Sequence, residues 1–152
     1  MRALVQRVLR AEVRVDGRVV GRIGPGLLVL LGVRRGDTST EADWLAAKLP
    51  ELRVFDGGGS AFDRCLRQTG GEVLVVSQFT LYGALRKGRR PDFAAAAGAP
   101  EARYLYGYFV DRLRSTGVPV QTGEFAARMD VELVNDGPVT VMLEREARPP
   151  PA

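Results

Sequence analysis

Polar side chains interrupt an apolar run near the middle of the chain. The stretch VLVVSQFTL, residues 73–81, follows four aliphatic residues with Ser77, Gln78 and Thr80. Polar residues in a strand that otherwise has core character indicate either a solvated edge or a binding site. If the strand continued through the stretch, Ser77 and Phe79 would point to one face, and Gln78 and Thr80 to the other. These residues are the first candidates for chemistry.

Histidine is absent from the sequence, which limits the chemistry available to these residues. Ser-His, Cys-His and His-metal sites are excluded. A hydroxyl nucleophile needs a base, and none lies beside Ser77 or Thr80 in the sequence. Backbone N–H groups could still stabilise an oxyanion, an effect worth roughly 3–4 kcal/mol per donor. The single Cys65 excludes an internal disulfide, fits a reducing, cytoplasmic compartment, and is expected to be an incidental buried thiol.

A second candidate is the Gly137-Pro138 pair inside LVNDGPVTVML, residues 133–143. Proline cannot donate to a sheet ladder, so its place in the middle of a β-rich run needs a reason. One interpretation is a hairpin turn, since Asn-Asp-Gly is turn chemistry. The other is that the Gly-Pro peptide projects into a binding site.

A third candidate is the basic segment RKGRRPDF, which holds the densest positive cluster of a chain with net charge +4. Its cations are Arg86, Lys87, Arg89 and Arg90. Arginine binds phosphate through two parallel hydrogen bonds, so the segment could bind a nucleic acid. A solvated loop explains the same charges.

The elements that must position these residues follow from hydrophobic period and turn signals. Asp16-Gly17 between two β-branched runs predicts a hairpin. Thr38 and Glu41 form a capping box at the start of a helix that Pro50 ends or kinks. Strands are expected over 2–15, 26–33, 52–55, 72–83, 118–125 and 128–144, and helical patterns over 37–52 and 99–117. This order predicts one α+β domain, residues 1–147, with two main helices on a curved, barrel-like mixed or antiparallel sheet, and a disordered tail at 148–152.

The combination of SQFTL, RKGRRPDF and QTGEFAARMDVELVNDGPVT resembles the bacterial D-aminoacyl-tRNA deacylases, and the likeness runs from Met1 to about Glu144. The resemblance implies a homodimer that hydrolyses the ester between a D-amino acid, or glycine, and the 3′-terminal adenosine of tRNA, and that spares L-aminoacyl-tRNA. It implies no cofactor and no metal.

The resemblance also implies roles for particular residues. Ser77, Gln78, Phe79 and Thr80 would line the aminoacyl pocket, with Phe125 and Met129 as neighbours. Gly137-Pro138 would be a cis peptide that enters the pocket of the other subunit, where its carbonyls exclude an L side chain. Main-chain donors near Phe79 and Thr80 would stabilise the oxyanion. The tRNA ribose hydroxyl is preferred as the assisting group over Thr80 as a nucleophile, because nothing in the sequence activates Thr80.

Two alternatives remain open. The chain could be an RNA-binding module without hydrolytic activity, since the basic segment suits both functions. It could also be a general small-ester hydrolase, if Glu132 or Asp136 folds against Thr80 as its base. No apolar run reaches the ~20 residues of a membrane span, and the charged N-terminus is unlike a secretory signal. A DNA partner is not expected, and the divergent segment 57–66 puts the tRNA footprint in doubt.

Overall fold

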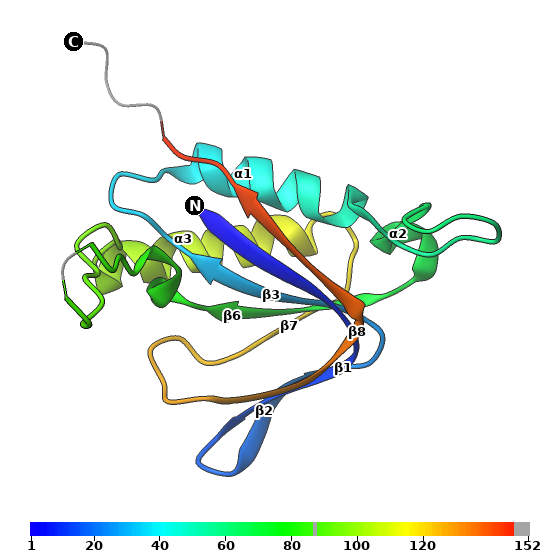
Figure 1. The fold of residues 1–152 in the computed structure, drawn as a ribbon, viewed down its shortest axis with the longest axis horizontal. Coiled ribbons are helices and arrows are strands. Elements are labelled where there is room, and N and C mark those ends of the chain that lie inside the picture. Colours follow the sequence, from blue (N-terminus) through cyan, green and yellow to red (C-terminus); the bar gives the residue numbers. More distant parts are fainter. Residues whose placement is uncertain (87, 148–152) are drawn as a thin grey trace.

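The computed structural model describes residues 1–86 and 88–147, so the predicted tail at 148–152 and Lys87 lie outside the described residues. The elements follow one another from the N-terminal strand to the long C-terminal strand (Figure 1). They are β1 (Arg2–Val15), β2 (Arg18–Ile23), β3 (Gly26–Gly32), α1 (Ser39–Lys48), η1 (Leu49–Glu51), β4 (Arg53–Phe55), β5 (Arg64–Cys65), α2 (Leu66–Thr69), β6 (Glu72–Ser77), η2 (Phe79–Tyr82), α3 (Ala99–Arg114), β7 (Val120–Thr122) and β8 (Asp130–Glu144).

The main sheet is mixed and has six strands, in the order β2-β1-β3-β6-β7 with β8 paired to β1. β1 pairs antiparallel with β2, β3 and β8, whereas β3–β6 and β6–β7 are parallel pairs. The sheet curves until β2 approaches β7, where a Cβ on Gly21 would lie only 2.4 Å from the carbonyl oxygen of Thr122. A residue without a side chain lets the two backbones close the barrel. The predicted α+β domain with a barrel-like mixed sheet is confirmed.

The turn between β1 and β2 is the predicted hairpin. Asp16 and Gly17 both have positive φ, 49° and 76°, as a type I′ turn requires. The Asp-Gly pair therefore sets the register of the β1–β2 pair.

The helices α1 and α3 cover one face of the sheet (Figure 1). Thr38 caps α1, and the predicted capping box with Glu41 is present. The predicted apolar face of α3 is buried in the core, with Phe109 and Leu113 fully enclosed. A smaller apolar cluster fills the opposite, concave side of the sheet and includes Leu74.

Two parts of the fold differ from the sequence prediction. The expected strand over 72–83 ends at Ser77, and residues 79–82 form the 3₁₀ helix η2. A short strand and a one-turn helix, β5 and α2, follow the glycine-rich loop, and Cys65 lies in β5. No helix in the described part of the chain is long and apolar enough to cross a membrane.

Candidate functional site

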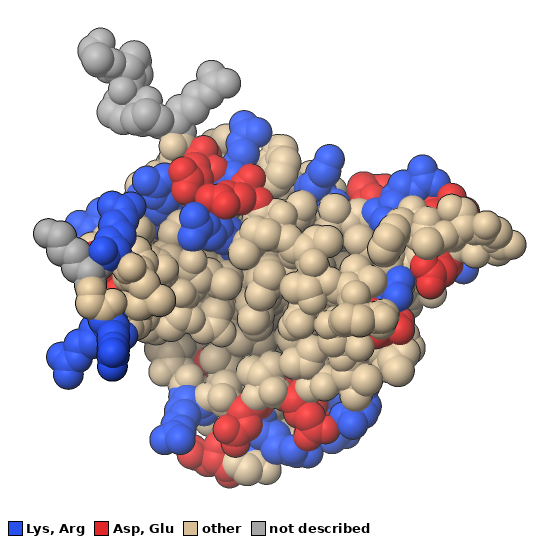
Figure 2. All heavy atoms as spheres, viewed as in Figure 1, with Lys and Arg blue, Asp and Glu red and all other residues tan. Residues whose placement is uncertain are grey.

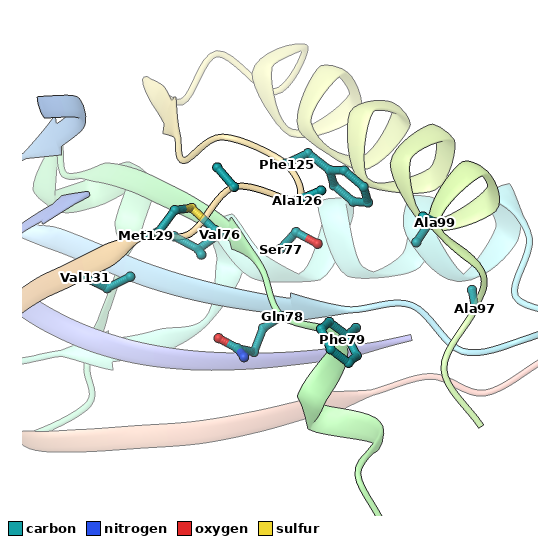
Figure 3. A pocket seen from close by; sticks show the side chains of 12 residues that line it. Val76, Ser77, Gln78, Phe79, Ala97, Ala99, Phe125, Ala126, Met129 and Val131 are labelled. Atoms are coloured by element: carbon teal, nitrogen blue, oxygen red, sulfur yellow. The ribbon is translucent and has the colours of Figure 1, made fainter. Parts of the chain in front are cut away.

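A pocket of about 550 Å³ opens where β6 ends. It lies between the start of η2, the N-terminal turn of α3 and the loop from β7 to β8 (Figure 3). Its walls are formed by Val76, Ser77, Gln78, Phe79, Ala97, Ala99, Ala102, Phe125, Ala126, Ala127, Met129 and Val131. Five of the residues predicted to form a site are thus brought to one cavity, namely Ser77, Gln78, Phe79, Phe125 and Met129.

The backbone leaves the sheet at Gln78, which has φ −140° and ψ 79°. The backbone amide of Gln78 still donates a hydrogen bond to the carbonyl of Leu31, at 2.7 Å. This is the final backbone hydrogen bond between the end of β6 and β3. Gly32 on β3 leaves room for the new direction, because a Cβ there would lie 3.1 Å from both the Gln78 carbonyl oxygen and the Leu81 Cβ. A close approach to β3 therefore turns the strand into η2.

The predicted alternation of faces from residue 77 to residue 81 is wrong for this reason. Ser77, Gln78 and Phe79 line the same pocket, and Thr80 is not among its lining residues. The Thr80 side chain is exposed, and its hydroxyl accepts a hydrogen bond from the side-chain amide of Gln78. No acid or amine of the described residues is hydrogen-bonded to that hydroxyl.

The first turn of η2 carries free main-chain donors. The first N–H groups of a helix have no partner within it. In the described part of the chain, the amides of Phe79 and Thr80 have no hydrogen-bond acceptor. The Phe79 ring is 53% exposed and packs edge-on against Phe93 at a centroid distance of 5.1 Å. Polar donors therefore adjoin an aromatic wall at the mouth of the pocket.

The pocket wall that contains Phe125 contacts β6 through a tyrosine of α3. Phe125 packs on Tyr106 at 5.8 Å, and the Tyr106 hydroxyl donates to the carbonyl of Val75 at 2.9 Å. Burial raises the pKa of Tyr106 to about 12, so the hydroxyl keeps its proton near neutral pH. Gly123 makes space for Met129, since a Cβ at this glycine would lie 2.7 Å from the Met129 sulfur.

Gly137 and Pro138 lie in β8, outside the pocket of their own chain. Thr140 is opposite Gln6 and Asn135 is opposite Val8, so residues 136–139 face Arg7 alone and form a bulge. Both halves of β8 pair with β1 in the same direction, and the hairpin interpretation is therefore wrong. The Gly137-Pro138 peptide is cis, and both residues are exposed.

Two side chains hold this bulge from below. Asn135 donates from its amide nitrogen to the carbonyls of Arg7, at 2.9 Å, and of Val139, at 3.0 Å. Arg7, only 7% exposed, donates to the carbonyls of Asp136, at 3.2 Å, and of Val54, at 2.7 Å. Its guanidinium also pairs with the Asp136 carboxylate at 3.2 Å. The bulge therefore rests on a rigid, buried base.

The two carboxylates that could have activated Thr80 are committed elsewhere. Glu132 pairs with Arg10 at 2.6 Å and with Arg14 at 3.4 Å, and these partners lower the pKa of Glu132. Asp136 pairs with Arg7. A general ester hydrolase that uses either residue as its base at Thr80 is contradicted by this geometry.

The predicted basic segment forms part of the loop that leads from η2 to α3. Arg86, Arg89 and Arg90 are exposed, and no ion pair is formed by them within the described residues. Lys87 lies outside the described residues. Figure 2 shows positive side chains gathered at this end of the molecule.

Sequence reasoning missed two groups of residues at these sites. Five alanines line the pocket, and the run FAAAAGAP before α3 could have indicated a wall with unusually small side chains. Arg7 occupies a position that continues the buried alternation of Ala3 and Val5. A charged residue on a buried face signals a fixed partner, since unpaired burial of a charge is costly.

Known proteins share both the sequence and the fold. A family model described as D-Tyr-tRNA(Tyr) deacylase matches residues 4–144. The D-aminoacyl-tRNA deacylase of Symbiobacterium thermophilum is 55% identical over 146 residues, covering 96% of this chain and 97% of that protein. The deacylase of Thermomicrobium roseum is 55% identical over 144 residues, covering 95% of this chain and 94% of that one.

The chain belongs to the D-Tyr-tRNA(Tyr) deacylase family. The resemblance drawn from SQFTL and NDGPVT is thereby confirmed. So is the enzyme class, a hydrolase of the D-aminoacyl-tRNA deacylase type.

Two solved structures show the same fold. One, described as c-Myc DNA Unwinding Element Binding Protein, has a TM-score of 0.91 and 42% identity, and the match covers 97% of this chain and all of that one (100%). Another, described as a probable eukaryotic D-amino acid tRNA deacylase, has a TM-score of 0.78 at 19% identity, covering 93% of this chain and 97% of that one. The fold of this chain is therefore shared by a structure of only 19% sequence identity.

Proposed function

We propose that this chain hydrolyses the ester bond of D-aminoacyl-tRNA in the cytoplasm and releases the D-amino acid and free tRNA. The observation that carries the proposal is the combination of family membership with a small-residue pocket whose mouth bears unpaired main-chain donors. Water adds to the ester carbonyl, the bond to the ribose oxygen breaks, and that oxygen leaves with a proton. Glycine esterified to tRNA fits the same pocket.

The amides of Phe79 and Thr80 are proposed to bind the oxyanion that forms as water adds. Preorganised donors of this kind favour the transition state because they need no reorientation during the reaction. Their lack of other acceptors among the described residues supports this role. Ser77 and Gln78 would contact the aminoacyl group from the same wall, opposite Phe125 and Met129.

The terminal ribose hydroxyl of the tRNA is proposed to assist proton transfer. The enzyme has no histidine, and the Thr80 hydroxyl is bonded only to the Gln78 amide in the described part of the chain. A nucleophilic Thr80 would need a base that this environment does not supply. The substrate therefore brings the group that the protein lacks.

Chiral selection is proposed to come from a second copy of the chain. The Gly137-Pro138 bulge is exposed, lies outside its own pocket and is held by Arg7 and Asn135. In a homodimer it would enter the pocket of the other subunit, where its carbonyls would occupy the space needed by an L side chain. A D side chain points away, and glycine has none, so exclusion by shape cannot reject glycine.

The tRNA backbone is proposed to run over the basic loop through Arg86, Lys87, Arg89 and Arg90. Exposed arginines that form no ion pair with the described residues suit a polyanion, and phosphate contacts of this type make binding depend on salt. No role is assigned to DNA.

The test is single-turnover deacylation of one tRNA charged separately with D- and L-tyrosine. Rapid release of D-tyrosine with the L-ester intact is expected. Binding of both esters without hydrolysis would instead favour the RNA-binding module. Equal hydrolysis of both would refute chiral selection. Sedimentation at assay concentration should give a dimer, and a fully selective monomer would refute the cross-subunit role of Gly137-Pro138.

A further inference from the structure

Arg103 lies on α3, one residue after the pocket-lining Ala102 and four after Ala99. Residues four apart on a helix share a face, so Arg103 follows Ala99 along the side of α3 that borders the pocket. Its guanidinium carbon lies 4.6 Å from the centroid of the Phe125 ring. Figure 3 shows Phe125 beside α3 at the pocket wall. A permanent cation is thus stacked on the wall of the candidate active site.

This cation has no other partner among the described residues. No hydrogen bond or ion pair there involves the Arg103 side chain, although Glu101 on the same helix and Glu124, next to Phe125, are both exposed. Two other arginines of α3 do have carboxylate partners. Arg112 pairs with Asp43 at 2.8 Å, and Arg114 pairs with Asp111 at 3.8 Å.

The contact with Phe125 holds the guanidinium over the ring but uses none of its N–H groups. These donors project from the edge of the plane in the fork geometry that matches a phosphate. The residue is exposed, so a ligand can reach those donors. The arrangement therefore offers a bidentate anion site at the pocket.

The substrate carries one anion close to the group that the pocket would hold. The aminoacyl ester and the 5′-phosphate of the terminal adenosine are attached to the same ribose. With the ester carbonyl at the amides of η2, this phosphate is the first negative charge outside the cavity. The following phosphates would continue toward the basic loop, which precedes α3 in the chain.

We propose that Arg103, stacked on Phe125, binds the 5′-phosphate of the terminal adenosine of the tRNA and so positions the ester in the pocket. The proposal rests on the proposed deacylase function. In this proposal Arg103 binds the substrate, so its loss should raise KM and leave kcat unchanged.

The test compares three D-tyrosyl esters: charged tRNA, adenosine 5′-monophosphate esterified on its ribose, and adenosine without phosphate. Arg103→Ala should lower kcat/KM for the two phosphate-bearing esters by about tenfold to a hundredfold more than for the adenosine ester, which corresponds to one lost charge-assisted contact. The salt dependence of tRNA binding should fall by about one phosphate contact. Arg103→Lys should recover part of the loss, and Arg114→Ala, on the same helix, is the matched control.

An equal loss on all three esters would mean that Arg103 only shapes the Phe125 wall, and no loss on any would leave it a solvated side chain. Either result overturns the proposal. If the wild-type protein hydrolyses none of the esters, the deacylase function itself fails. Titration with a CCA oligoribonucleotide then still tests Arg103, because unchanged affinity in Arg103→Ala would refute the phosphate contact.

Discussion

Replacing Arg7 by methionine should destabilise the protein severely and disturb the bulge at Gly137-Pro138. Arg7 is 7% exposed and makes two hydrogen bonds to main-chain carbonyls, at 2.7 Å to Val54 and 3.2 Å to Asp136. A hydrogen bond to a charged group contributes about 1.5–3 kcal/mol. The carboxylate partners, Asp136 and Asp56, are 41% and 63% exposed, so their ion pairs add little.

Two such bonds give an expected loss of about 3–6 kcal/mol in the free energy of unfolding. For a chain of 152 residues, this corresponds to a fall in Tm of about 6–24 °C. Thermal and urea unfolding should be followed at one fixed protein concentration, because dimerisation would make stability concentration-dependent.

Arg10→Met is the matched control on the same strand. Arg10 is 58% exposed and pairs with the half-exposed Glu132, so its loss should change stability by at most about 1 kcal/mol. At a temperature where Arg7→Met is still folded, hydrolysis of L-tyrosyl-tRNA should rise relative to the D-ester. A Tm of Arg7→Met within about 2 °C of wild type would correspond to a loss of at most about 1 kcal/mol. That result would refute the argument that the buried Arg7 supports the bulge.

Three further outcomes are expected. Thr80→Ala should keep deacylation within about tenfold of wild type, a smaller loss than the roughly hundredfold or more that an acid-base group contributes. Complete loss of activity in a folded variant would restore Thr80 as the nucleophile. Gly137→Ala should lower the free energy of unfolding by about 1–3 kcal/mol, because φ is +119° and a Cβ would lie 2.9 Å from the Val139 side chain. It should also weaken rejection of L-tyrosyl-tRNA. An unchanged ratio of the D- and L-ester rates would argue against a role of the bulge in chiral selection. Burial opposes ionisation of Glu41, but hydrogen bonds from the Thr38 hydroxyl and amide outweigh it and lower its pKa. Because the pKa of Glu41 is lower in the folded than in the unfolded protein, its carboxylate stabilises the fold at pH values above the unfolded pKa. This stabilisation is lost as the pH falls through the folded pKa. Glu41→Gln should therefore make the free energy of unfolding less dependent on pH below about pH 4.

Local signals predicted much of this fold. The Asp16-Gly17 turn and the Thr38–Glu41 capping box depend on a few adjacent residues, and both are present. The apolar face of α3 depends only on helical spacing, and its residues are buried as expected. These features need no knowledge of distant parts of the chain.

The errors concern contacts between distant segments. Residues 78–81 have a strand-like composition, but Gly32 allows them to close against β3 as a 3₁₀ helix. Arg7 could be recognised as unusual from its position on a buried face, yet Val54 and Asp136 as its partners could not be inferred from sequence. The alanines of the pocket carry no polar signal, and only the fold shows which of them line it.

The proposed division of the site between two subunits would explain why Gly137-Pro138 lies outside the pocket of its own chain, whereas SQFTL lies beside it. The donors of η2 lie beside their own pocket, so one chain contains the proposed apparatus for stabilising the oxyanion. The bulge faces solvent in the same chain, yet the buried Arg7 and the half-buried Asn135 both hold its main chain by hydrogen bonds. A fold gains little by anchoring an exposed bulge so firmly unless its position matters to something outside the chain. The anchoring of this bulge is therefore an argument for a second subunit that is independent of the family resemblance.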